Sequence, residues 1–270
     1  MDVQVYANGV LGGDREVLEA IALGTVQMSN VASSNLANYD KRLSIYEMPF
    51  LFDSFESATA AYDGELGEYY NELLAEHDFL NMGVSTYGWR ALSNGVREVW
   101  TPDDMNGLKI RVMEVDMYID TFKLLGSNPT PMSWNEIYTG LQQGTIEGQD
   151  NSAEQTYLAR FHEVQKYYST INHTLSNGLN ICKKSYIESL PEDIQQVLWD
   201  GIAIFLEKQR ETSVADEQEY LEKMEEEGIT VCRLSDEQRA LFAERVAPVW
   251  DQFRELLGDE AFELAISYTN

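Results

Sequence analysis

Cysteine, proline, histidine and basic residues are all scarce in this 270-residue chain, and long hydrophobic runs are absent. Lys and Arg number 19 against 46 Asp and Glu, which gives a net charge of −27. A charge of that sign repels phosphate backbones and anionic lipid headgroups, and no segment concentrates Lys and Arg enough to override it. We therefore expect neither nucleic-acid binding nor binding to a membrane surface.

The hydrophobic residues never form a run of about 18, so the sequence predicts neither a membrane-spanning helix nor direct membrane insertion. The first residues, MDVQVYANGVLGG, also lack the basic and apolar regions of a secretory signal. We therefore expect no signal peptide within this chain, and the sequence leaves open whether one was removed or never existed.

Histidine and cysteine are too few and too dispersed for the common metal and hydrolase sites. No histidine lies within one helical turn of another, and neither an HExxH nor a GxSxG string is present. No glycine-rich phosphate loop occurs, which excludes the usual nucleotide sites. We expect no metal, no cofactor and no catalytic set. Cys182 and Cys232 are either two buried thiols or one disulfide.

Hydrophobic residues make up 44% of the chain, enough for a sizeable core, and they follow alternating strand and helix patterns. Such alternation indicates an α/β protein with largely parallel sheets. Strands are expected near 3–5, 25–31, 79–87 and 108–112, and helices near 14–23, 65–76, 115–125 and 134–143. Two further apolar stretches cover 168–175 and 179–186. Asp53 and Glu56 have the spacing of a capping box for a helix that begins near Ser54.

One helical pattern is unusually long, beginning at Pro191 and continuing to about Glu227. At 1.5 Å per residue such a helix reaches about 50 Å, which exceeds the width of one small domain. A chain of 270 residues is long enough for one or two domains of about 150 residues, so we expect the helix to run either across two domains or along their outside. No low-complexity linker separates them, which indicates two lobes joined by several chain crossings.

Three strings hold the most specific information: VWTPDDMNGLKIRVME (99–114), LLGSNPTPMSWNEIYTGLQQGTIEGQDN (124–151) and EVQKYYSTINHT (163–174). Together with NGVLGGDREVLEAIALGTVQMS, MPFLF and SLPEDIQQVL, the chain resembles the solute receptors of tripartite ATP-independent periplasmic (TRAP) transporters, of the dicarboxylate-receptor (DctP) type. The similarity extends over almost the whole chain, in the same order and spacing.

The resemblance implies a two-lobed α/β fold, with a ligand cleft between the lobes and the long helix across both. We expect residues 1–89 and 177–215 in lobe I, and residues 90–176 and 216–270 in lobe II. Family members begin with a strand and a helix before the segment equivalent to DVQVYANG, so that initial βα unit is expected to be missing here. The family's DGqEN string reads Glu147-Gly148-Gln149-Asp150-Asn151 in this sequence, with the two acids exchanged.

Arg111 matches the family arginine that grips the ligand carboxylate. A guanidinium meets a carboxylate through two parallel hydrogen bonds, and Arg111 stands near the end of an expected strand, where ligand crevices form in α/β sheets. On its position alone, the alternative interpretation is a strand charge that is exposed or paired with one of the 46 acidic residues.

Further residues match positions that line the family's cleft. Asn151 matches an asparagine that donates to the same carboxylate, Arg90 a second arginine near it, and Trp134 an aromatic ring over the ligand. His173 matches a histidine near the hinge. The loop residues expected to face the ligand from lobe I are Ser33, Ser34 and Asn35. The alternatives are core packing for Trp134 and His173, a turn cap for Asn151, and a surface position for Arg90 and the loop residues.

The resemblance implies a periplasmic solute-binding protein without catalytic activity. It is expected to be a monomer that captures a small organic acid by cleft closure and delivers it to the membrane permease subunits of a TRAP transporter. Two other classes remain as alternatives, an α/β enzyme acting on a carboxylate substrate and a sensor module that presents its ligand to a receptor. Dicarboxylates, keto acids, sugar acids and sialic acids all present the same carboxylate, so the sequence does not distinguish among them.

Overall fold

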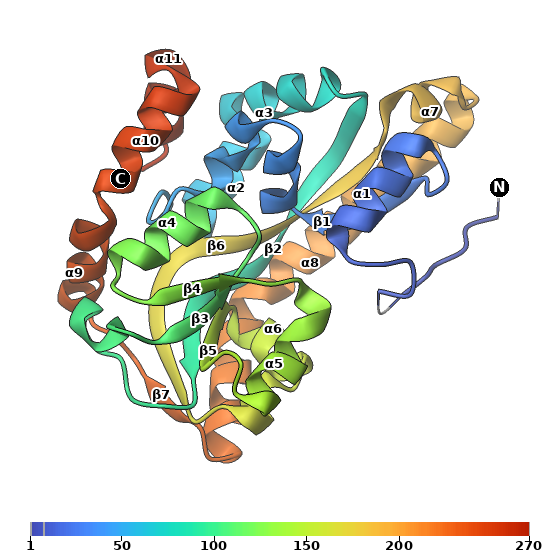
Figure 1. Cartoon of the computed structure of the whole chain (residues 1–270). Helices are drawn as coiled ribbons and strands as arrows, with labels where there is room; N and C mark the ends of the chain where they lie inside the picture. Colours follow the sequence, from blue (N-terminus) through green and yellow to red (C-terminus); the bar gives the residue numbers. More distant parts are fainter. Residues whose placement is uncertain (1, 8, 270) are drawn as a thin grey trace.

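The computed structural model of the chain describes residues 2–7 and 9–269. Their strands form one seven-stranded sheet in the order β1-β6-β2-β5-β3-β4, with β7 beside β6 (Figure 1). The strands are β1 (Met28–Ala32), β2 (Phe79–Asn94), β3 (Lys109–Val112), β4 (Asn128–Pro131), β5 (Gly148–Asn151), β6 (Tyr167–Lys183) and β7 (Thr230–Cys232).

Helices surround this sheet. The α-helices are α1 (Asp14–Leu23), α2 (Phe55–Asp63), α3 (Glu65–Ala75), α4 (Asp116–Leu124), α5 (Ile137–Gln143), α6 (Ala153–Leu158), α7 (Lys184–Ser189), α8 (Glu192–Glu226), α9 (Asp236–Val246), α10 (Pro248–Leu257) and α11 (Asp259–Ile266). Short 3₁₀ helices are η1 (Ser33–Asn38), η2 (Lys41–Glu47), η3 (Pro102–Met105), η4 (Trp134–Glu136) and η5 (Phe161–Val164). No helix within the described residues is long and apolar enough to cross a membrane.

The sheet is mixed, so the expectation of largely parallel sheets is wrong. The β2–β6, β1–β6 and β2–β5 pairs are antiparallel, and among the described strands only the β3–β4, β3–β5 and β6–β7 pairs are parallel. The two apolar stretches expected at 168–175 and 179–186 merge into the single strand β6, which then continues into α7. The polar residues between them stay in the ladder because β2 and β1 supply hydrogen-bond partners there.

Two halves of the sheet meet along the long strands. β1 pairs with the Gly178–Cys182 end of β6, whereas β5 pairs with Ala91–Asn94 of β2. Between these ends the β2–β6 ladder shifts register from Thr86 to Trp89, and Gly88 has a φ of +87° that favours glycine. Figure 1 shows both strands running from the α7 end of the molecule to the β7 end. This arrangement is the two-lobed fold that the sequence predicts.

The long helix is confirmed as α8, which has 35 residues and ends before Gly228. It packs along β2 and reaches both α6 and β7. Its side chains bond to the β2 backbone where the ladder is irregular. Gln209 accepts from the Thr86 amide (2.9 Å), and Arg210 donates to the Val84 carbonyl (2.9 Å). α8 therefore supports the strand at the point where it passes from one half to the other.

Residues 3–5 do not form the expected strand. Val3 and Val5 are exposed, and among the described strands β1 pairs only with β6. A hollow of about 750 Å³ lies between residues 2–6 and β1. An extended segment without a hydrogen-bonding neighbour gains no ladder, which explains why the alternating valines remain irregular.

Helix starts follow local side-chain chemistry closely, with one correction. The box that opens α9 joins Ser235 and Gln238, as their spacing predicts. The box that opens α2 joins Ser54 and Ser57 rather than Asp53 and Glu56. The Ser54 hydroxyl accepts from the Ser57 amide (3.1 Å), which places the cap one residue later than expected.

The C-terminal helices pack back onto the segment that precedes α2. The Trp250 indole donates to the Pro49 carbonyl (3.0 Å), and the Thr269 hydroxyl donates to the Leu51 carbonyl (3.0 Å). Cys182 and Cys232 are both free and buried, so the disulfide alternative does not apply. The largest apolar cluster extends from α1 through α3 and α4 to α10.

Candidate ligand-binding site

Arg111 is a buried cation on β3. Its side chain is 4% exposed, and its Nε donates to the Met132 carbonyl (2.8 Å). Among the described residues, no carboxylate lies within ion-pair distance of it, and no other hydrogen bond is formed by its guanidinium. Burial lowers the pKa of Arg111 to about 10, so the group remains charged near neutral pH. A guanidinium has five N–H donors, and most of those on Arg111 are thus available to a ligand.

Asp14 approaches Arg111 from the other half of the sheet. It begins α1, and its Oδ2 accepts from the Ala32 amide (3.1 Å) and from the Asn35 side chain (2.9 Å). Burial raises the pKa of Asp14, and the charge of Arg111 partly opposes that shift. In the sequence, Asp14 is marked only as the first residue of an expected helix. No local pattern distinguishes it from the other acidic residues that begin helices in this chain.

Arg90 is held by an acid. Its Nε donates to Asp150 Oδ2 (2.8 Å), its Nη2 donates to the Asp150 carbonyl (2.5 Å), and both side chains are buried. Burial alone would raise the pKa of Asp150, but the adjacent Arg90 and His173 lower it overall. His173 Nε2 lies 3.4 Å from the same Oδ2. Arg90 and His173 therefore belong to one buried ionic cluster on β2, β5 and β6.

Asn151 lies on β5 beside this cluster. Its side-chain amide donates to Gln149 Oε1, and Gln149 in turn donates to Ser93 Oγ (2.8 Å). Gln149 is the register partner of Arg111 on β3, and Asn151 is the register partner of Ala91, next to Arg90 on β2. Adjacent strands thus bring Arg111, Asn151 and Arg90 to one region of the sheet.

The remaining predicted residues lie around the same region in different ways. Ser34 is buried and donates to Met113 Sδ (3.1 Å), two residues after Arg111. Asn35 is held by Asp14, as described above. Trp134 is 42% exposed and its ring lies against Phe161, with centroids 5.2 Å apart. A half-open ring of this kind has a face available for stacking, which the buried members of the cluster lack.

Glu47 and Tyr118 form a buried contact that was not predicted from the sequence. The Tyr118 hydroxyl donates to Glu47 Oε2 (2.5 Å), and Ser33 donates to Glu47 Oε1. The Arg90 guanidinium carbon lies 5.2 Å from the centre of the Tyr118 ring. Burial raises the pKa of both Glu47 and Tyr118. No sequence motif marks this pair, because its members are separated by 71 positions.

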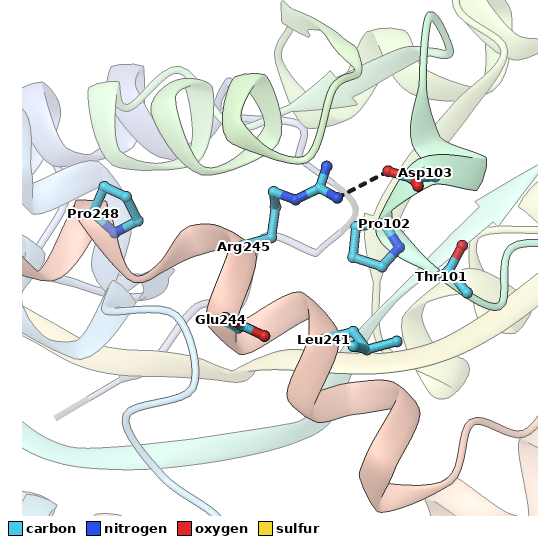
Figure 2. A pocket seen from close by; sticks show the side chains of 7 residues that line it. All are labelled: Thr101, Pro102, Asp103, Leu241, Glu244, Arg245 and Pro248. Atoms are coloured by element: carbon cyan, nitrogen blue, oxygen red, sulfur yellow. Dashed lines mark hydrogen bonds and ion pairs between the residues drawn. The ribbon is translucent and has the colours of Figure 1, made fainter.

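A separate hollow of about 530 Å³ lies between η3 and α9, away from this polar region. Figure 2 shows Arg245 reaching across it to Asp103, with 2.8 Å between Nη2 and Oδ1. None of the predicted site residues lines it. Within the described chain, no group of three or more His, Cys, Asp or Glu side chains could hold a metal ion.

A two-lobed α/β fold with a buried arginine that has no ion pair among the described residues is the class of structure expected of a solute-binding protein. The chain belongs to the bacterial extracellular solute-binding protein family 7 (DctP), whose model matches residues 1–256. The predicted resemblance to TRAP solute receptors is confirmed, and the family is one of binding proteins rather than enzymes.

Individual relatives agree with this assignment. The chain is 34% identical to a solute-binding protein of Verminephrobacter eiseniae (97% of this chain, 77% of the relative) and 31% identical to the 2,3-diketo-L-gulonate-binding periplasmic protein YiaO of Escherichia coli (90% and 74%). The crystal structure of the sugar acid binding protein DctPAm from Advenella mimigardefordensis in complex with galactonate is similar at a TM-score of 0.95 and 27% identity. That alignment covers 99% of this chain and 86% of the other.

Proposed function

We propose that this protein captures a small organic acid in the periplasm and delivers it to the membrane permease subunits of a TRAP transporter. The observation that carries the proposal is Arg111, a buried cation without a carboxylate partner in the described chain. A buried charge without a counter-ion is costly, so a ligand carboxylate would complete the site. The galactonate and 2,3-diketo-L-gulonate of the two relatives are both sugar acids, which favours this class.

In this proposal each remaining residue has a distinct role. Asn151 donates to the same carboxylate, and Trp134 covers the ligand with its ring. Asn35 and Ser34 face the ligand from lobe I, with Asp14 beside them. Arg90 and His173 act near the acid group through Asp150, which already occupies the Nε of Arg90. The protein acts as a monomer, and its lobes comprise residues 1–89 with 177–215, and 90–176 with 216–270.

The net charge of −27 does not oppose binding of an anion. Beyond a Debye length of about 8 Å that field is largely screened at physiological salt. Arg111 acts at contact distance in a buried region, where the effective dielectric constant is lower than in water. The local guanidinium therefore outweighs the overall charge.

Calorimetric titration of Arg111→Ala tests the proposal. A thermal-shift screen of galactonate, D-glucuronate and succinate first selects the acid that stabilises the wild type most. Arg111→Ala leaves the bound carboxylate unpaired, at a cost of about 3–5 kcal/mol. This corresponds to roughly 100- to 4,000-fold weaker affinity. Arg111→Lys keeps the charge but loses the planar fork, so it recovers only part of the affinity.

Arg245→Ala is the matched control, since Arg245 forms an exposed pair with Asp103 away from the site. It should leave the affinity unchanged. Binding by Arg111→Ala within about threefold of wild type, or loss of its folding, would contradict the role given to Arg111. Failure of every organic acid to bind the wild type would contradict the function itself.

A further inference from the structure

The contact between Glu47 and Tyr118 joins the two halves of the molecule. Glu47 ends η2 and accepts from Ser33 at the start of η1, so its carboxyl group belongs to the half that contains β1. Tyr118 lies in the first turn of α4, which packs against β3 and β4 in the other half. The 2.5 Å hydrogen bond between Tyr118 and Glu47 therefore crosses the seam between them.

Other contacts also join segments of the two halves, and two of them lie close to Glu47 and Tyr118 in the sequence. Ser34 donates to Met113 Sδ (3.1 Å), and Lys41 Nζ lies 2.8 Å from Asp116 Oδ2. The Lys41–Asp116 pair is exposed and screened by water, so it contributes little. The Glu47–Tyr118 bond is buried. Its loss leaves a Glu47 carboxyl oxygen without that hydrogen bond in a place that water does not reach, which is costly.

Tyr118 also contacts the polar cluster behind the site. Its ring lies beneath the Arg90 guanidinium at 5.2 Å, and the His173 ring meets it edge-on at 6.3 Å. Tyr118 follows Arg111 by seven residues, through the end of β3 into α4. A contact between Tyr118 and the half that contains Glu47 therefore depends on the separation of the two halves.

We propose that Glu47 and Tyr118 are positioning residues that hold the two lobes closed and thereby set how long an organic acid stays bound. The proposal rests on the proposed function, because it requires lobes that close over a ligand. The bond exists only when the halves meet, so its free energy adds to the closed state alone. Its loss shifts the closed-to-open ratio and speeds dissociation, while association of the acid with the open protein is unaffected.

Tyr118→Phe tests this proposal because it removes one oxygen and keeps the ring beneath Arg90. A hydrogen bond to a carboxyl group is typically equivalent to a tenfold or larger change in an equilibrium constant. We expect the dissociation rate of galactonate to rise about tenfold, with an association rate within twofold of wild type. Glu47→Gln keeps an acceptor oxygen for Tyr118, so most of the wild-type residence time should be retained.

Tyr70→Phe is the matched control. Tyr70 is equally buried, but its hydroxyl contacts the Ser33 carbonyl (3.5 Å) within one half. It should lower the melting temperature without changing the dissociation rate. Asp116→Asn, which weakens the exposed cross-seam pair, should also leave that rate within twofold of wild type.

A distance measurement separates this proposal from the function on which it rests. Spin labels at Glu72→Cys on α3 and Gln142→Cys on α5 lie on exposed positions of opposite halves. Burial raises the pKa of Cys182 to about 12 and also raises that of Cys232, so the native thiols resist labelling. Tyr118→Phe should reduce the short-distance population of the ligand-free protein about tenfold.

The possible outcomes are distinct. A short-distance population and dissociation rate within twofold of wild type overturn the proposal, as does a wild type that never shows the short distance. An effect of Tyr70→Phe equal to that of Tyr118→Phe overturns it too, because a general loss of packing would then be the cause. If no organic acid binds the wild type, the proposed function fails and the ligand-free distances alone decide.

Discussion

At the scale of single residues, the two buried arginines differ in their partners. Arg90 is fixed by Asp150 at 2.8 Å, whereas Arg111 has no such acid in the described part of the chain. A cation that already has its counter-ion contributes to the folded state, and one that lacks it is suited to a ligand. The exchange of acids in the segment 147–151 leaves a carboxylate in place to pair with Arg90.

Asp150→Asn should therefore destabilise the fold strongly. The substitution removes the charge that compensates Arg90 in a buried site, and breaking such a pair costs about 3–5 kcal/mol. Urea denaturation measures this change in the free energy of unfolding. Asp103→Asn is the control, because its pair with Arg245 is exposed and should cost under about 1 kcal/mol. Equal effects of the two variants would refute the difference drawn between these pairs.

Glu217 on α8 predicts a pH dependence of stability. The Trp89 amide bonds to its carboxyl group, Arg239 and Tyr168 lie near it, and burial raises its pKa from the usual 4.5 to about 7. A raised acid pKa stabilises the fold fully below pH 4.5, and this contribution is lost as the pH rises from about 4.5 to 7. Glu217→Gln does not titrate, so its melting temperature relative to wild type should increase between pH 5 and pH 8. A difference that stays constant over this range would contradict the prediction.

The sequence could predict only part of the site, and the reason is physical. Arg111, Asn151 and Arg90 lie in strings whose order and spacing are characteristic of a family, and adjacent strands bring them to one region of the sheet. Glu47 and Tyr118 meet through tertiary packing between segments 71 residues apart, and no local pattern encodes that contact. The ligand roles of Trp134 and of the η1 residues stay predictions.

At the scale of elements, Gly148 on β5 and Gly201 on α8 differ in how much space a larger side chain would have. A Cβ at Gly148 of β5 would lie 2.4 Å from the Ser93 carbonyl oxygen on β2 and 2.9 Å from Ile110 Cδ1 on β3. Gly148→Ala should therefore destabilise the fold by about 1–3 kcal/mol, since neighbouring backbone must shift. Gly201→Ala on α8 meets nothing within 4 Å and should stabilise it by about 0.5–1 kcal/mol. Chemical denaturation compares them, and a Gly148→Ala variant as stable as wild type would mean that β5 can move freely.

Helices were more predictable than strands because their signals are local. Gly24 ends α1 in the left-handed conformation, and Ser235 with Gln238 opens α9, both within a few residues of the hydrophobic pattern. Strand pairing depends on distant neighbours. β6 continues through Ser176 and Asn177, the polar residues between its two apolar stretches, and both are buried. The antiparallel direction of the β2–β6 pair was not predicted because the two strands are separated by a long segment of chain, so no local pattern indicates how they pair.

At the scale of the whole molecule, three elements connect the halves, namely β2, β6 and α8. Several crossings restrict the relative motion to a hinge, because a single flexible tether would allow any orientation. One of the three register shifts in the β2–β6 ladder lies between Thr86 and Trp89, near the middle of both strands, and interrupts the pairing there. α8 bonds to that segment through Gln209 and Arg210, so bending of the strand is coupled to the helix.

Closure of the two halves over an organic acid is the prediction that belongs to this scale. One half supplies Arg111 and Asn151, and the other supplies Asp14 and Asn35, so a ligand contacts both sets only when the halves meet. Closure also excludes water, which strengthens the contact between carboxylate and guanidinium. Small-angle X-ray scattering should therefore give a smaller radius of gyration with saturating galactonate, or with whichever acid binds, than without it. Arg111→Ala at the same acid concentration should keep the larger radius, because the acid is not retained. Superimposable curves for wild type with and without a bound acid would mean that binding does not require closure, and the hinge at residues 86–89 would then have no role in capture.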